Sequence, residues 1–260
     1  MIINRVVFAS NSNKNYIEFW PLVAKAWSSL GVKPTLIYTD EDDSCVDKEC
    51  GDVIYIPKID GLDSAFVAQN SRLLCPALFP EEVCIISDID NMPLSKEYYF
   101  KPIKDLNDDK FVIYRPHVCD DDQISIMWNA ALGKTWGDIF NISDFNDVIS
   151  TLKSWYPKEY KAFSGFGSVH DTWFTDQLLL YKYVESFREN NSEKIVELDD
   201  DTSGFYRLDR LCNDSKCSTV YNSEANYSDF HMPRPYSQYK KQIDEIYEFY
   251  YGNNRDSQTK

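Results

Sequence analysis

The stretch VCIISDIDNMPLS, residues 83–95, is a short apolar run that ends in two aspartates one residue apart. Val83 to Ile86 precede a charged segment and a proline, which is typical of a buried central strand. Asp88 and Asp90 follow at the point where that strand ends. Burying one uncompensated carboxylate is costly, and placing two together costs more. The pair therefore predicts a binding site at the end of the strand.

The composition narrows the class of protein. The chain has 260 residues, of which 43% are hydrophobic and 15% aromatic, so it can bury a substantial core. Its formal charge of −15 argues against nucleic acid or an anionic membrane as a partner. An acidic chain that binds phosphate needs a metal ion or a few well-placed basic side chains. We expect no membrane span and no signal peptide, and hence a soluble, cytoplasmic protein.

Strand and helix patterns alternate along the first hundred residues. The strands are expected at 5–10, 34–40, 51–57 and 81–90, and the helices at 15–31 and 63–79. This alternation predicts a mostly parallel sheet with helices on both faces. Ligands bind such sheets at the carboxyl ends of the strands, where Asp40, Asp88 and Asp90 all fall.

The second half of the chain has a less regular pattern. We expect strands at 110–116 and 124–136, the latter with a turn, short extended pieces at 204–211 and 227–233, and helices at 144–156, 171–187 and 237–252. No repeat or linker interrupts the chain. We therefore expect one domain over 1–252, with a nucleotide-binding half at 1–100, an acceptor-binding half at 101–252, and a disordered tail at 253–260.

The two aspartates suit a divalent cation. Carboxylate oxygens are the ligands that Mg²⁺ and Mn²⁺ prefer, and two carboxylates leave coordination positions open for phosphate oxygens. Such an ion also offsets the repulsion between the aspartates and attracts a diphosphate. An Asp-x-Asp pair also arises by chance in acidic chains, so its position after an apolar strand matters.

Longer segments resemble a known family. NSRLLCPALFPEEVCIISDIDNMPLS (70–95) resembles the core of nucleotide-sugar glycosyltransferases of the GT-A fold. Further along, WNAALGKTW (128–136), TDQLLL (175–180) and DFHMPRPY (229–236) are similar to motifs of glycosyltransferase family 8 and its relatives. The last motif lacks the Gly that family 8 carries between its His and its basic residue.

The resemblance implies a metal-dependent transfer of a sugar from a nucleotide diphosphate, UDP rather than GDP, to a glycan hydroxyl. It implies that Mn²⁺ or Mg²⁺ is bound by Asp88, Asp90 and His231. It also implies that the nucleotide-sugar contacts are made by Ser10, Asp40, Arg72, Asp88, Asn129, Gln177 and Arg234. Among these, Arg234 would contact the leaving diphosphate, and Asp40 would accept a hydrogen bond from the base. His231 as a structural residue and Asp40 as a turn cap are the competing interpretations.

The catalytic group depends on the stereochemistry, which the sequence leaves open. An inverting enzyme needs a carboxylate base near the acceptor hydroxyl, and Asp176 is preferred over Asp171. In a retaining enzyme, Asp176 and Gln177 would position the sugar instead. Trp128, Trp136 and Trp173 suit either acceptor stacking or core packing. A phosphatase with an Asp-x-Asp motif and a non-enzymatic carbohydrate- or metal-binding module are the alternative functions.

Overall fold

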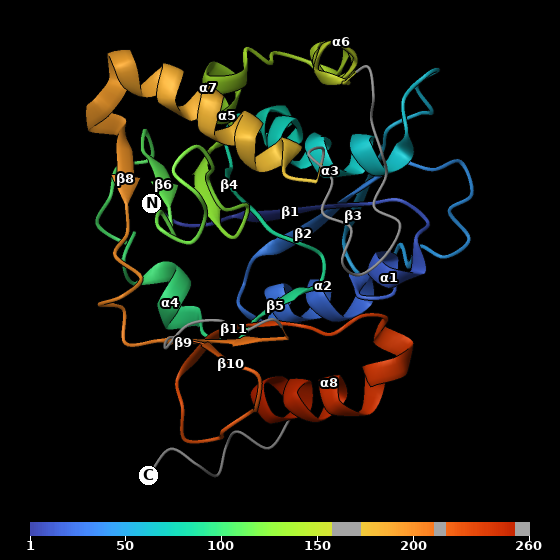
Figure 1. Ribbon diagram of the computed structural model, residues 1–260, viewed down its shortest axis with the longest axis vertical. Helices are drawn as coiled ribbons and strands as arrows, with labels where there is room; N and C mark the ends of the chain where they lie inside the picture. The colour runs from blue at the N-terminus through green and yellow to red at the C-terminus, as the bar shows by residue number, and fades with distance from the viewer. Residues whose placement is uncertain (158–172, 211–216, 253–260) are drawn as a thin grey trace.

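The structure is a computed structural model that describes residues 1–157, 173–210 and 217–252. Its centre is a seven-stranded sheet with the strand order β3-β2-β1-β4-β7-β6-β8 (Figure 1). The strands are β1 (Arg5–Ser10), β2 (Lys33–Tyr38), β3 (Asp52–Tyr55), β4 (Val83–Ile86), β6 (Phe111–Ile113), β7 (Asn129–Leu132) and β8 (Ile195–Glu197). Among them only β7 runs antiparallel to its neighbours. The predicted α/β architecture with a mostly parallel sheet is confirmed.

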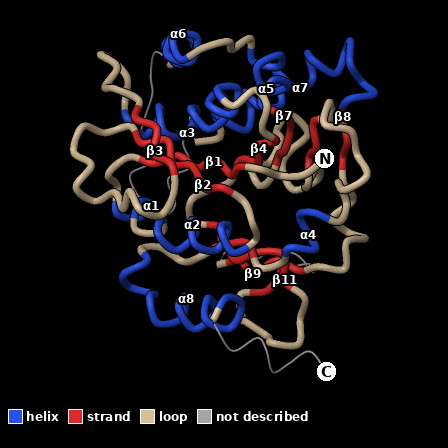
Figure 2. Tube along the Cα trace, turned by 180° about the vertical axis from the view of Figure 1, so that it is seen from behind, coloured by secondary structure: helices blue, strands red, loops and turns tan. Residues whose placement is uncertain are grey.

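Helices cover both faces of this sheet (Figures 1 and 2). One face carries α3 (Ser64–Leu74), α5 (Gly133–Phe140), α6 (Phe145–Trp155) and α7 (Thr175–Asn191), and the other carries α1 (Lys14–Ile17), α2 (Trp20–Ser29) and α4 (Lys96–Phe100). Alternate residues of each strand enter separate cores. Val83 and Ile85 pack on the α2 side, whereas Cys84 and Ile86 pack on the α3 side. The central strand is thus buried on both faces, which explains its unbroken apolar run.

A second, four-stranded sheet lies below α2 (Figure 1). It has the order β10-β9-β11-β5 and comprises β5 (Asn91–Pro93), β9 (Tyr206–Asp209), β10 (Cys217–Ser218) and β11 (Tyr227–His231). The helix α8 (Tyr236–Tyr251) packs beneath it. Because β5 follows β4 within a few residues and pairs with β11, His231 lies opposite Asn91, the residue after Asp90. The two sheets therefore join at the Asp-x-Asp segment.

Local differences from the sequence-based expectations have clear causes. The helix expected at 15–31 is two helices, because α2 begins at Trp20 with Pro21 in its first turn. The turn expected near residue 133 is the helix α5, which Gly133 allows to lie against backbone: an added Cβ would sit 2.1 Å from the carbonyl oxygen of Phe79. The short elements β5, α4, β8 and β10 were not expected. The tail expected at 253–260 lies outside the described residues.

Candidate active site

A cavity of about 330 Å³ opens at the carboxyl end of β1 and β4. Its walls come from these strand ends, from α3, from the segment 125–127, from the start of α7 and from the end of β11. Its volume falls in the range of small-molecule sites. Eight of the predicted site residues line it: Ser10, Arg72, Asp88, Asp90, Asp176, Gln177, His231 and Arg234.

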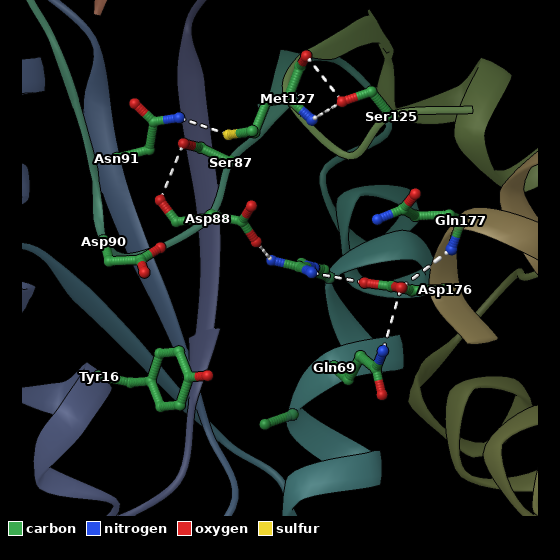
Figure 3. Close-up of polar contacts among 12 residues, drawn as sticks. Tyr16, Gln69, Ser87, Asp88, Asp90, Asn91, Ser125, Met127, Asp176 and Gln177 are labelled. Atoms are coloured by element: carbon green, nitrogen blue, oxygen red, sulfur yellow. Dashed lines mark hydrogen bonds and ion pairs between the residues drawn. The ribbon is translucent and has the colours of Figure 1, made fainter. Parts of the chain in front are cut away.

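Arg72 joins the two sides of this cavity. Its guanidinium, carried by α3, donates through one nitrogen to Asp88 Oδ1 and through the other to Asp176 Oδ2. Gln69 Nε2 donates to Asp176 Oδ1 at 3.1 Å. The backbone N–H of Gln177 donates to the same oxygen at 2.9 Å (Figure 3). Burial raises the pKa of Asp176 above its ordinary value, and the opposing effect of Arg72 does not cancel it.

Asp90 lies deeper in the cavity and faces two guanidinium groups and an imidazole. Its Oδ2 is 2.9 Å from Arg210, 3.5 Å from Arg234 Nε and 3.7 Å from His231 Nε2. Burial opposes ionisation, but Arg210, His231 and Arg234 together hold the pKa of Asp90 below its usual range. The group is therefore a carboxylate at neutral pH even though only 3% of the residue is exposed.

His231 is oriented by a second carboxylate. Its Nδ1 lies 3.0 Å from Asp209 Oδ1, because β9 and β11 run parallel and place these two residues side by side. Asp209 also pairs with Arg207 at 2.8 Å, and Arg207 in turn reaches Asp229, which pairs with the fully buried Arg115 at 2.6 Å. A histidine held this way at Nδ1 presents Nε2 to a ligand, an arrangement common at metal sites.

The fit to a divalent cation is best at Asp90 and His231. Asp90 Oδ2 and His231 Nε2 face each other across 3.7 Å, and both line the cavity. Asp88 lines it too, but its Oδ1 is engaged by Arg72. In the described part of the chain, no group of three His, Cys, Asp or Glu side chains is close enough to hold a metal ion. Two of the three predicted ligands are thus brought together, and the third is directed elsewhere.

Two further predicted residues, Asp40 and Asn129, lie apart from this cavity. Asp40 lines a neighbouring hollow, where its Oδ2 accepts from the Ser12 amide at 2.7 Å. Asn129 is fully buried, with its amide donating to the Ser125 carbonyl at 2.7 Å. Asp171 lies outside the described residues.

Of the three candidate tryptophans, two lie in the core and one lines the cavity. Trp128 and Trp136 are fully buried, and their indole N–H groups donate to Ser87 Oγ and to the Cys84 carbonyl. Core packing is therefore their role. Trp173 lines the cavity.

The sequence interpretation missed several residues of the cavity, and three of these contact charged residues of the predicted site. Tyr16 accepts a hydrogen bond from Arg234 and lies under its guanidinium, Gln69 contacts Asp176, and Arg210 contacts Asp90. For Arg210 a signal existed, because Asp209-Arg210 lies near the end of the extended piece expected at 204–211, as Asp88 and Asp90 lie at the end of theirs. Tyr16 and Gln69 carry no comparable signal in the sequence.

Comparison with known proteins finds solved structures with an architecture similar to that of this chain. No family model matches the chain, and no curated protein sequence matches it. Among solved structures, the glycosyltransferase GlyE of Streptococcus pneumoniae is similar with 16% identity and a TM-score of 0.43 over 76% of this chain. The galactosyltransferase LgtC, in complex with donor and acceptor sugar analogs, is similar with 10% identity and a TM-score of 0.47.

The matched lengths differ between these two structures. This chain spans 46% of the GlyE chain and 96% of the LgtC chain, and the LgtC match covers 95% of this chain. Similarity of this size leaves the activity to be argued from the site itself. Among the described residues, no helix combines the length and the apolar character needed to cross a membrane.

Proposed function

We propose that this chain is a glycosyltransferase of GT-A type that moves a sugar from a nucleotide diphosphate donor to a hydroxyl of a glycan. The observation that carries the proposal is the arrangement around Asp90. A buried carboxylate and an oriented histidine nitrogen face one cavity, together with the guanidinium groups of Arg234 and Arg210. Such a mixture of metal ligands and cations matches a diphosphate that carries a divalent ion.

In this proposal Asp90 and His231 hold Mn²⁺ or Mg²⁺, with Asp88 as a third ligand once it leaves Arg72. Imidazole favours Mn²⁺ over Mg²⁺. When bound, the ion supplies positive charge that stabilises the departing diphosphate. Asp209 keeps the His231 ring oriented through the 3.0 Å contact at Nδ1.

Arg234 stabilises the same leaving group in this proposal. Its side chain is 11% exposed, and its guanidinium lies 3.5 Å from Asp90 and is braced by the Tyr16 hydroxyl and ring. A braced guanidinium loses little freedom when it binds phosphate oxygens, so the interaction is available as charge develops.

Asp176 and Gln177 position the sugar in this proposal. Both carboxylate oxygens of Asp176 already accept hydrogen bonds, from Arg72 on one side and from Gln69 and the Gln177 amide on the other. A group so engaged is better suited to orienting a substrate than to removing a proton from the acceptor. The Gln177 side chain also lines the cavity.

UDP is the proposed nucleotide, as the resemblance implies, and the test uses both UDP- and GDP-sugars. Thermal unfolding is followed with each donor, with and without Mn²⁺, for the original chain, for Asp90→Asn and for the matched surface control Asp105→Asn. A donor at about 100 times its Kd adds about 2.7 kcal/mol to the free energy of unfolding. We expect a metal-dependent rise of several degrees with one donor class, lost in Asp90→Asn and kept in Asp105→Asn.

Turnover is then measured as release of nucleoside diphosphate in the presence of candidate glycans. Metal-dependent binding without any release would indicate a binding module, and release of inorganic phosphate from phosphate esters would indicate a phosphatase. Either result would contradict the proposal, as would the absence of any response to metal and donor together.

A further inference from the structure

Arg210 lies where a cation would bind to Asp90. It immediately follows β9, and its guanidinium is 2.9 Å from Asp90 Oδ2, the same oxygen that faces His231 Nε2 at 3.7 Å. A divalent ion held between Asp90 and His231 would need this oxygen. Arg210 and the ion therefore compete for one carboxylate.

The contacts of Arg210 leave it able to change partners. One guanidinium nitrogen contacts both Asp90 and the Met232 carbonyl oxygen, whereas its Nε is buried and has no hydrogen-bond partner within the described residues. The side chain is 9% exposed and lines the cavity. An arginine with an unused buried donor gains when an acceptor enters the cavity, because an unpaired buried donor is costly.

Arg234 is also near Asp90, but its contacts leave it less able than Arg210 to change partners. It lies farther from the carboxylate, at 3.5 Å, and the Tyr16 hydroxyl and ring hold it in place. Of these two arginines, Arg210 makes the shorter contact to Asp90, so displacing it frees the oxygen that the cation needs.

We propose that Arg210 is an exchangeable counter-ion of Asp90: it occupies the carboxylate in the free enzyme, gives it up to the divalent cation, and binds the diphosphate of the donor instead. This inference rests on the proposed function and concerns its binding order. Two consequences follow. The cation alone binds weakly because it must displace Arg210, and the diphosphate favours the cation because it offers Arg210 a new partner. By linkage the cation strengthens diphosphate binding by the same factor.

The test measures two binding constants separately, without turnover. Mn²⁺ binding to the protein alone is followed by the loss of the free Mn²⁺ paramagnetic resonance signal. Binding of UDP, and of inorganic diphosphate as a nucleotide-free probe, is followed calorimetrically in EDTA. The variant is Arg210→Gln, and Arg188→Gln is the matched control because it removes one partly buried, ion-paired arginine of α7 that does not line the cavity.

The expected changes have opposite signs. A charge-assisted contact is worth about ten- to a hundredfold in affinity. Arg210→Gln should therefore bind Mn²⁺ about tenfold more tightly, and UDP and diphosphate about tenfold more weakly, than the original chain. Arg210→Lys keeps the charge, so it should retain weak Mn²⁺ binding, and Arg188→Gln should change neither constant. Circular dichroism confirms that each variant is folded.

Three results would overturn the inference. If Arg210→Gln leaves both constants unchanged, or moves both in the same direction, Arg210 is not an exchangeable counter-ion, while the proposed function stands. If the variant does not fold, Arg210→Lys decides, and a tighter Mn²⁺ affinity in that variant contradicts the competition. If the original chain binds neither Mn²⁺ nor UDP, separately or together, the proposed function fails as well.

Discussion

Replacing Arg72 by Met tests how the cavity holds a buried carboxylate. Arg72 contacts both Asp88 and Asp176, and the Asp176 side chain is 3% exposed. Methionine keeps an unbranched apolar stem but has no charge, so within the described residues Asp176 is left with the hydrogen bonds from Gln69 and the Gln177 backbone N–H. Removing one partner of a buried ion pair typically costs about 3–5 kcal/mol.

Protonation of Asp176 limits how much free energy of unfolding the Arg72→Met variant can lose. Without Arg72 the carboxyl escapes burial of its charge by taking up a proton, which costs about 1.36 kcal/mol for each pH unit between its ordinary pKa of about 3.9 and the solution pH. The loss is therefore at most about 4 kcal/mol at pH 7 and about 1.5 kcal/mol at pH 5. The already raised pKa of Asp176 in the original chain makes the loss smaller than these limits. The pair with Asp88, whose side chain is 28% exposed, adds less.

Proton linkage gives the direction in which the stability of the variant changes with pH. The native variant binds the Asp176 proton more tightly than the unfolded chain does, so its free energy of unfolding falls as the pH rises from about 4 toward 7. Urea unfolding of both proteins at pH 5, 6 and 7 measures the difference. A loss below about 1 kcal/mol at pH 7, or an equal loss at pH 5 and pH 7, would refute this account. The double variant Arg72→Met/Asp176→Asn should regain most of the stability, and Arg188→Met should behave like the original chain.

Three further changes test packing, electrostatics and capping. Gly133→Ala should lower the free energy of unfolding by about 1–3 kcal/mol, because the added Cβ meets the Phe79 carbonyl at 2.1 Å; the midpoint of urea unfolding checks this. Burial opposes ionisation of Asp229, but Arg115 holds its pKa below the usual range, so Asp229→Asn should be destabilised near pH 7, and the gap to the original chain should close as the pH falls below about 4. An equal gap at pH 3 and pH 7 would contradict that assignment. Asp144→Ala removes the side-chain cap of α6 and should cost about 1 kcal/mol in thermal unfolding while UDP affinity stays unchanged.

The first half of the fold was predictable because its signals are local. β1 covers the expected residues 5–10, and α3 begins after Asp63, whose side chain caps it by accepting from the Ala65 amide at 2.8 Å. The apolar run before Asp88 is continuous because both faces of β4 are buried. Each of these features depends on neighbours a few residues away, so the sequence carries it directly.

The second sheet was not predictable in the same way. β5 and β10 have three and two residues, too few for a periodic pattern, and β5 is a strand only because β11 pairs with it from the far end of the chain. That pairing carries His231 to Asp90, and the neighbouring β9 brings Arg210. The sequence identified the histidine through a motif, but it gave no spacing that would show what lies beside it.

The sequence by itself determined that two carboxylates end a buried strand in an α/β chain, because burial periodicity and strand-end position are local properties. Only the tertiary structure decided which cations those carboxylates meet: Arg72 for Asp88, and Arg210 and Arg234 for Asp90. The reason is physical. A charge in a cavity is stabilised by groups within a few ångströms, and the chain brings those groups together from distant segments by sheet pairing and helix packing.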